Sequence, residues 1–115
     1  MPRLLDRAEI DAKLKKLEGW KRDGSFITKT YEFEEFMDGI ELIRGVARVA
    51  EEREHHPDIH LKYTKVTLAL QTHSAGGVTA LDFGLAGAIE RSVRAKRTKR
   101  RGRAEPPSSG EERSK

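Results

Sequence analysis

Cysteine is absent from the 115 residues of this chain. This excludes disulfides, thiolate nucleophiles and thiolate metal ligands. No apolar run approaches the roughly 20 residues that a membrane-spanning helix needs. At the N-terminus, the segment MPRLLDRAEIDAK has acidic residues where a signal peptide would have its apolar stretch. We therefore expect a cytoplasmic protein without a membrane anchor, whose chemistry depends on histidine, carboxylates, hydroxyls and the backbone.

The excess of positive charge is confined to the C-terminal end. Residues 94–115 hold nine Lys or Arg and three acids, whereas residues 1–93 hold 14 bases and 16 acids. The end of the chain also lacks an apolar period, so we expect a domain over residues 1–98 and a disordered basic tail over 99–115. Such a tail is either a weak contact for nucleic acid or an acidic partner, or a solubilising extension. The charge balance of the domain itself does not indicate a basic DNA-binding face.

Apolar residues recur at helical spacing in three segments, with two pairs of strand-like segments between them. The strand pairs surround turns near Asp23-Gly24 and near Thr64-Lys65. These patterns predict a short helix ending near Gly19, a hairpin over 20–33, a helix over 36–53, strands over 59–63 and 66–70, and a last helix opened by Thr79 and Asp82, whose core side includes Leu81 and Leu85. The order α-β-β-α-β-β-α predicts an α+β fold in which three helices pack on one face of a four-stranded antiparallel sheet.

Four histidines lie within 19 residues, and histidine both gives and takes protons near neutral pH. His55 and His56 follow the long helix and precede the strand that begins near Ile59. They are candidates for catalysis, although a histidine at a helix C-terminus also interacts favourably with the helix dipole. His73 lies at the end of a strand, before a glycine-containing loop, and is either functional or merely exposed. His60 falls on the opposite face of its strand from Ile59, so we interpret it as a solvated or interface residue.

Metal binding and serine catalysis find little support. Pro57 interrupts helical geometry between His56 and His60, so these two histidines do not form a helical pair of metal ligands. A nucleophile elbow around serine is absent. Two carboxylates have open interpretations: Asp82 either bonds a histidine or caps the last helix, and Glu51 either binds a polar ligand edge or belongs to a solvated row.

The spacing of these residues resembles the signature of the pterin-4a-carbinolamine dehydratases, also known as dimerisation cofactors of a homeodomain transcription factor. The matching positions are Glu51, His55-His56-Pro57 after three residues, Tyr63 after five, His73 after nine and Asp82 after eight. The flanking pattern is similar too, so the resemblance covers about residues 17–93. The signature itself matches throughout; outside it, residue 59 is isoleucine, where relatives often carry an aromatic residue.

The resemblance implies a four-stranded antiparallel sheet with three helices, in dimers that pair their sheets edge to edge and sometimes stack into tetramers. It also implies dehydration of 4a-hydroxytetrahydropterin to quinonoid dihydropterin without metal or organic cofactor, which recycles pterin for aromatic amino-acid hydroxylases. The implied catalytic residues are His55, His56 and His73, supported by Glu51 and Asp82. The implied pocket includes these histidines together with Pro57, Thr72, Ser74 and Ala75.

A binding module is the alternative to the enzyme. The same fold also serves as an assembly chaperone or transcriptional dimerisation cofactor with an idle site, and proteins of that kind can lose the histidines. Because His55, His56 and His73 are all present, the sequence favours the enzyme.

Overall fold

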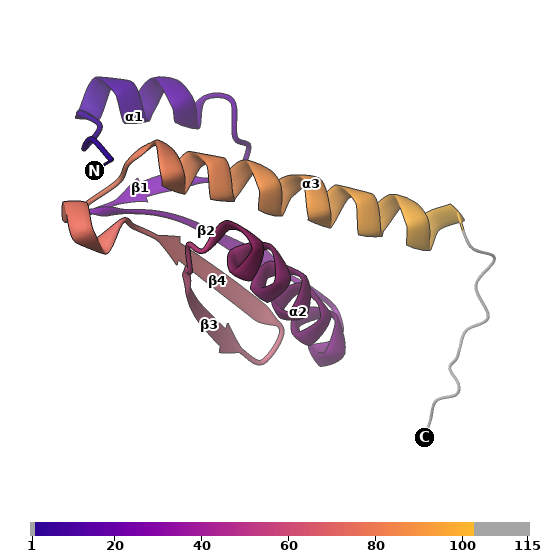
Figure 1. Cartoon of the computed structure of the whole chain (residues 1–115). Coiled ribbons are helices and arrows are strands. Elements are labelled where there is room, and N and C mark those ends of the chain that lie inside the picture. The colour runs from indigo at the N-terminus through magenta and orange to yellow at the C-terminus, as the bar shows by residue number, and fades with distance from the viewer. Residues whose placement is uncertain (1, 103–115) are drawn as a thin grey trace.

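A computed structural model describes residues 2–102, with the side chains of residues 2–95. Its elements follow the predicted order α-β-β-α-β-β-α, with one additional 3₁₀ turn (Figure 1). They are α1 (Arg7–Leu14), β1 (Lys21–Asp23), β2 (Phe26–Glu32), α2 (Phe36–Arg53), β3 (Asp58–Lys62), β4 (Lys65–Leu70), the 3₁₀ turn η1 (His73–Ala75) and α3 (Ala80–Gly102). The predicted α+β fold is confirmed.

The four strands form one antiparallel sheet in the order β1-β2-β4-β3. Because β4 pairs with β2 on one side and with β3 on the other, β3 becomes an edge strand. In this register Asp58 pairs with Ala69, so the chain just before β3 runs beside the chain just after β4. The sheet therefore brings the α2–β3 junction and the segment after β4 to the same end of the molecule.

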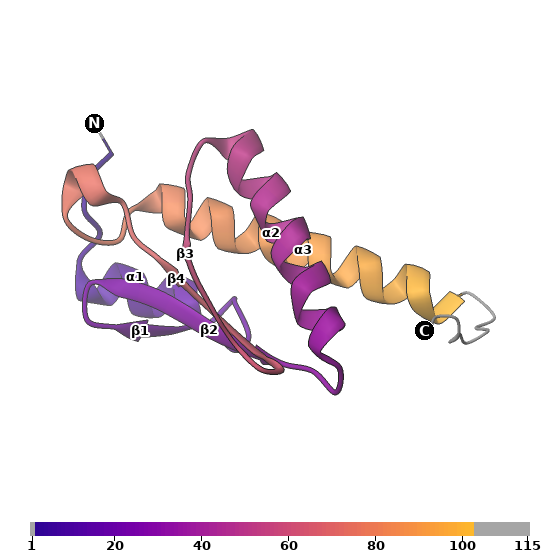
Figure 2. The ribbon, with the colours of Figure 1, turned by 90° about the horizontal axis from the view of Figure 1, so that it is seen from below.

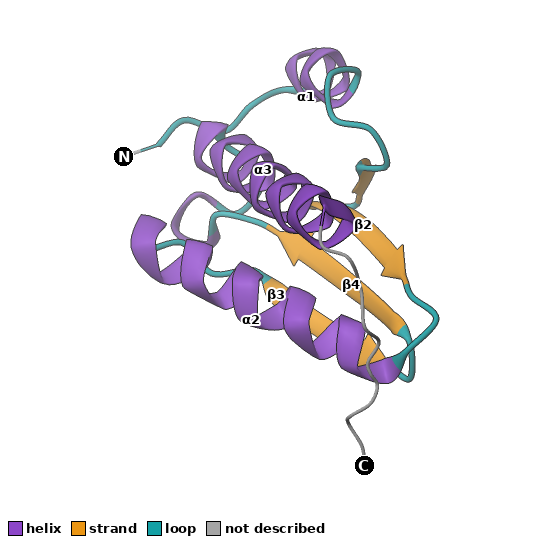
Figure 3. Ribbon diagram, turned by 90° about the vertical axis from the view of Figure 1, so that its right-hand side faces the viewer, coloured by secondary structure: helices purple, strands orange, loops and turns teal. Residues whose placement is uncertain are grey.

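Helices α2 and α3 lie side by side over one face of the sheet, and α1 lies beyond α3 (Figure 3). From the sheet, the core contains Ile27 and the alternating residues of β4, namely Val66, Leu68 and Leu70. From the helices it receives Val46, Leu85 and Ile89. Close packing explains a glycine in the first turn of α2, because a Cβ on Gly39 would lie 3.2 Å from Cγ2 of Val66.

Two predictions about individual side chains were wrong. Tyr63 does not continue the alternation of β3: it has a left-handed backbone, with a φ of 54°, in the β3–β4 turn, and it is 75% exposed. The turn thus falls at Tyr63-Thr64, one residue earlier than predicted. Leu81 is 49% exposed instead of lining the core. In the first turn of α3 the fully buried position belongs to Asp82, and Leu81 lies about 100° away from it around the helix.

Helix α3 is longer than the body that it covers, and it extends past α2 and the sheet (Figures 1 and 2). Its backbone is helical to Gly102, beyond the start of the tail predicted over 99–115. The remainder of that tail, residues 103–115, lies outside the described residues. Within the described part of the chain, no helix is both long and apolar enough to cross a membrane.

Candidate active site

The end of α2 determines the position of His55. Glu54 adopts a left-handed conformation, with φ 53° and ψ 41°, and this stops the helix. The amide of His55 then donates to the carbonyl of Ala50 at 3.1 Å, and the amide of Glu54 donates to that of Glu51 at 3.3 Å. These two bonds form a Schellman motif, which turns the chain sharply away from the helix axis. His55 is consequently held at a fixed point at the end of α2.

Asp82 connects that point to α3. The side chain of Asp82 is completely buried, and its Oδ1 lies 2.6 Å from Nε2 of His55. Its Oδ2 accepts from the hydroxyl of Thr72 at 2.8 Å and from the backbone amide of Thr79 at 2.9 Å. The carboxylate therefore has three donors from three separate segments. The two interpretations left open for Asp82 both hold, since it caps α3 and also bonds a histidine.

Thr72 and Thr79 belong to a chain of hydrogen bonds in which the donor and the acceptor of each bond are determined. Because the Thr72 hydroxyl donates to Asp82, its oxygen must accept from Thr79, whose hydroxyl lies 2.8 Å away. The Thr79 oxygen in turn accepts from the amide of Leu81 at 3.1 Å. Every polar group in this buried chain thus has a partner, as the low polarity of a protein interior requires. We expect such a satisfied network to hold Asp82 rigidly.

His73 follows Thr72 directly, in the η1 turn. The turn is closed by the amide of Thr72, which donates to the carbonyl of Gly77 at 2.9 Å, and by a left-handed Gly76 with φ 77°. His73 and Ser74 are exposed, and Ala75 is half-buried. His73 is therefore one residue from the network that holds His55, although the two histidines are 18 positions apart in the sequence.

His56 has a different environment from its neighbour. Its Nε2 lies 2.6 Å from Oε2 of Glu51, but the side chains of the two residues are 60% and 76% exposed. Water competes with an ion pair of this kind, so it fixes the ring weakly. Pro57, the next residue, is half-buried and leads into β3. The first histidine of the pair is thus held in the protein, and the second lies at its surface.

Most of this domain matches a known protein family. Residues 3–92 match the family described as pterin 4 alpha carbinolamine dehydratase. This chain belongs to that family. The pterin-4a-carbinolamine dehydratase resemblance seen in the spacing of the histidines is thereby confirmed.

Individual members of the family are similar over nearly their whole length. A protein of Roseiflexus castenholzii, provisionally named a pterin-4-alpha-carbinolamine dehydratase, is 45% identical over 93 residues, which cover 81% of this chain and all of the relative. One of Mycolicibacterium smegmatis, with the same provisional name, is 43% identical over 76% of this chain and 94% of its own length.

Two solved structures share the fold of this pterin-4a-carbinolamine dehydratase family member. A transcriptional coactivator/pterin dehydratase from Brucella melitensis has a TM-score of 0.74 and 30% identity, over 78% of this chain and 98% of that one. A pterin dehydratase-like protein identified as a RuBisCO assembly factor in the alpha-carboxysome has a TM-score of 0.55 and 19% identity, over 65% and 89%. At that identity, the second likeness concerns the fold alone.

A second polar cluster, which the sequence did not indicate, lies around Glu90, eight positions or about 12 Å further along α3 than Asp82. Glu90 Oε2 accepts from Nζ of Lys29 at 2.8 Å, from Nε1 of Trp20 at 3.1 Å and from the hydroxyl of Tyr31. Burial opposes ionisation of this carboxyl, but the hydrogen bonds from Lys29, Tyr31 and Trp20 outweigh it and lower the pKa of Glu90. The partners lie 59 to 70 positions from Glu90, so no local motif could have revealed them.

Among the described residues, no three His, Asp or Glu side chains are grouped as ligands of a metal ion. His55 and His56 illustrate the reason, because their Nε2 atoms bond different carboxylates on different helices. The candidate site presents imidazole, carboxylate and hydroxyl groups.

Proposed function

We propose that this chain dehydrates 4a-hydroxytetrahydropterins to quinonoid dihydropterins. In this reaction the bond between C4a and its hydroxyl oxygen breaks, N5 loses its proton, and a double bond forms between N5 and C4a as water leaves. The reaction therefore needs a base at N5 and an acid at the departing hydroxyl. Each such proton transfer typically contributes about 10²–10⁴-fold to the rate.

The hydrogen bond to Asp82 supports His55 as the base. Because the Asp82 carboxylate accepts, the Nε2 atom of His55 carries the proton. In the neutral ring, Nδ1 then holds the free lone pair and can take the proton from N5. The ring is 15% exposed, so part of it remains accessible to a small ligand. The buried Asp82 carboxylate also stabilises the imidazolium that forms, as the carboxylate of a catalytic triad does.

We assign proton delivery to His73, because it is exposed and follows Thr72, whose side chain bonds Asp82. The exposed pair of His56 and Glu51 is suited to orienting the polar pterin ring rather than to a buried proton transfer. Pro57 and the backbone of residues 72–75 belong to the same proposed pocket. The His55–Asp82 hydrogen bond is the single observation on which this assignment most depends.

The test is a spectrophotometric assay of synthetic 4a-hydroxytetrahydropterin with the purified full chain. We expect dehydration well above the spontaneous rate, and no requirement for an added metal ion or organic cofactor. A rate that equals the spontaneous one, measured on protein shown to be folded by circular dichroism, would contradict the proposal.

A catalytically idle binding module is the second candidate function. It draws support from the 30% identical Brucella melitensis protein, whose description combines transcriptional coactivator with pterin dehydratase. Retention of His55, His56 and His73 supports the enzyme instead. The assay above separates the two, because an idle module leaves the spontaneous rate unchanged.

As a dehydratase, the protein would act in the cytoplasm and recycle the pterin used by aromatic amino-acid hydroxylases. We also propose that it forms a homodimer or homotetramer. The unpaired edge of β3 supports this, because an exposed strand edge offers free backbone groups to a second copy. Ile59 on that strand is 37% exposed, which would allow an apolar contact there.

A further inference from the structure

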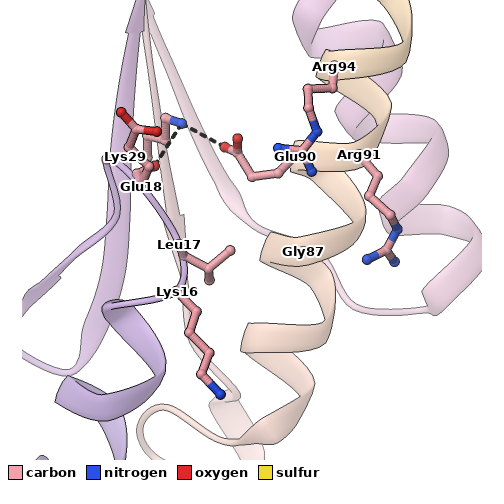
Figure 4. Close-up of a pocket in the computed structure, with 9 residues that line it drawn as sticks. Lys16, Leu17, Glu18, Lys29, Gly87, Glu90, Arg91 and Arg94 are labelled. Atoms are coloured by element: carbon pink, nitrogen blue, oxygen red, sulfur yellow. Dashed lines mark hydrogen bonds and ion pairs between the residues drawn. The ribbon is translucent and has the colours of Figure 1, made fainter.

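An open groove of about 690 Å³ lies between the segment that follows α1 and the middle of α3 (Figure 4). One wall is formed by residues 16–19, which follow α1, and the other by one side of α3. On the α3 side, Gly87 leaves room, and a Cβ added there would lie 3.5 Å from Nη1 of Arg91. The guanidinium of Arg91 therefore folds back along the groove wall. This groove is separate from the candidate active site.

The lining of the groove has a net positive charge, with four Lys or Arg and two Glu. Lys29 and Glu90 pair with each other at 2.8 Å, so their charges cancel. Within the described part of the chain, the side chains of Lys16, Arg91 and Arg94 have no hydrogen bond or ion pair, and all three are exposed. The only other acid on the lining is Glu18. The net charge of −2 over residues 1–93 is a sum over the whole domain, so it does not reveal this local excess of positive charge.

Further basic residues follow along α3, away from the groove. Residues 91–101 hold seven Lys or Arg and no acid, and the backbone is helical to Gly102. The segment 91–102 spans about 17 Å at 1.5 Å per residue. Val93 still packs against the core, whereas the C-terminal part of α3 extends past the sheet and α2 (Figures 1 and 2). A basic helix therefore projects from the domain, with the groove at its base.

We propose that this groove and the projecting part of α3 bind the phosphate backbone of duplex DNA. An α-helix with its side chains is about 10–12 Å across, which fits the roughly 12 Å width of the major groove. Figure 4 shows Lys16 and Arg91 on opposite walls of the groove, an arrangement that suits a row of phosphates better than a single small anion. Arginines and lysines at such positions contact phosphates without reading sequence.

Other polyanions match the surface less well. Proteins that bind single strands stack the bases on aromatic side chains, but residues 91–102 contain no aromatic residue, and Trp20 and Tyr31 bond Glu90. A membrane-surface helix needs a large apolar face, whereas Val93 is the largest apolar residue in this segment. Duplex DNA is thus the polyanion that the helix geometry and composition favour.

DNA binding and dehydration occupy different parts of α3. Arg91 lies nine positions after Asp82, which corresponds to about 14 Å along the helix axis. Substitutions in the groove are therefore expected to leave the dehydration rate unchanged. This makes the proposal independent of the proposed enzymatic activity.

The test measures fluorescence anisotropy of a labelled duplex of mixed sequence, about 20 base pairs long, so that the charged segment is fully covered at 3.4 Å per pair. The full chain is compared with the double variant R91A/R94A in about 0.1 M salt. Loss of two phosphate contacts reduces affinity by about 60-fold and lowers the slope of log K against log salt by about 2. K16A removes one contact and weakens binding about eightfold.

The control is R44A/R48A, which removes two exposed arginines from α2, away from the groove. It is expected to weaken binding by less than the factor of about eight that corresponds to one phosphate contact. Three results would overturn the proposal: no binding by the wild-type chain, an equal loss in R44A/R48A, or equal affinity for a single strand or for polyglutamate. Circular dichroism and the dehydration rate verify that each variant is folded.

Discussion

Replacing Asp82 by asparagine changes one carboxylate oxygen into an NH2 group and keeps the shape of the side chain. In the wild type, Oδ2 has two donors, from Thr72 and Thr79, and Oδ1 has one, from His55. The asparagine oxygen is expected to face the side with two donors. Its NH2 group then faces Nε2 of His55 and donates to it.

This reversal moves the proton of the neutral His55 ring from Nε2 to Nδ1. The proposed base then has no lone pair at Nδ1 for the pterin. We expect a loss of about 10²–10⁴-fold in kcat, the usual contribution of a general base. All three hydrogen bonds also lose a charged acceptor, at about 1 kcal/mol each, so Asp82→Asn is expected to lower stability by about 3 kcal/mol. For a domain of this size that lowers Tm by roughly 15 °C.

Glu51→Gln is the matched control. It makes the same chemical change at the same 2.6 Å distance from a histidine, but on a pair that is more than half exposed. Exposed ion pairs contribute about 0–1 kcal/mol, so the effects on Tm and kcat are expected to be small. Both variants are assayed with synthetic 4a-hydroxytetrahydropterin at a temperature where circular dichroism shows them folded. If folded Asp82→Asn kept wild-type turnover, or if Glu51→Gln lost as much, the reasoning would be refuted.

Three further predictions concern the histidines, the second polar cluster and the domain boundary. His55→Ala and His73→Ala should each lower kcat by about 10²–10⁴-fold at saturating substrate. Glu90 has a lowered pKa, so its ionised form stabilises the fold above the ordinary value of 4.5, and this stability is lost as the pH falls below that value. Glu90→Gln should therefore make Tm depend less on pH in the acid range. At neutral pH it should lower the free energy of unfolding by about 1–3 kcal/mol. A chain that ends at residue 98 should keep its Tm and its activity.

Each of these has a contradicting result. Wild-type turnover in both histidine variants would show that they transfer no protons in the rate-limiting step. An acid limb of unchanged steepness in Glu90→Gln would place the pH dependence in other carboxyl groups. A large fall in Tm after truncation at residue 98 would show that the predicted tail over 99–115 contributes to the folded domain.

Regular patterns in the sequence were sufficient to predict the order of the elements, although α1 ends at Leu14 and not near Gly19 as predicted. Helix α2 has the predicted bounds, because its apolar residues recur at three and four positions and Pro57 follows shortly after its end. β4 buries every second residue, as its alternation indicated. Tyr63 was the exception, since alternation assumes an extended backbone and Tyr63 has a left-handed one. Its conformation depends on the two-residue turn between paired Lys62 and Lys65.

The candidate site was predictable only in part. The spacing of Thr79 and Asp82 indicated a cap, and the cap is present. That the same carboxylate bonds His55 depends on α2 ending beside the start of α3, which no local pattern specifies. The family resemblance implied a place for Thr72 in the pocket, but the hydrogen bond from its hydroxyl to Asp82 was not predicted, because a threonine after a strand is compatible with many environments. Contacts between distant segments are therefore the part that required the structure.

The proposed mechanism depends most directly on which nitrogen of His55 carries the proton. Nitrogen-15 NMR of the full chain with labelled histidine measures this near neutral pH, with His55→Ala used to assign the signals. We predict that neutral His55 is protonated at Nε2 and unprotonated at Nδ1 in the wild type, and that Asp82→Asn reverses the two. A wild-type ring protonated at Nδ1 alone would contradict the account.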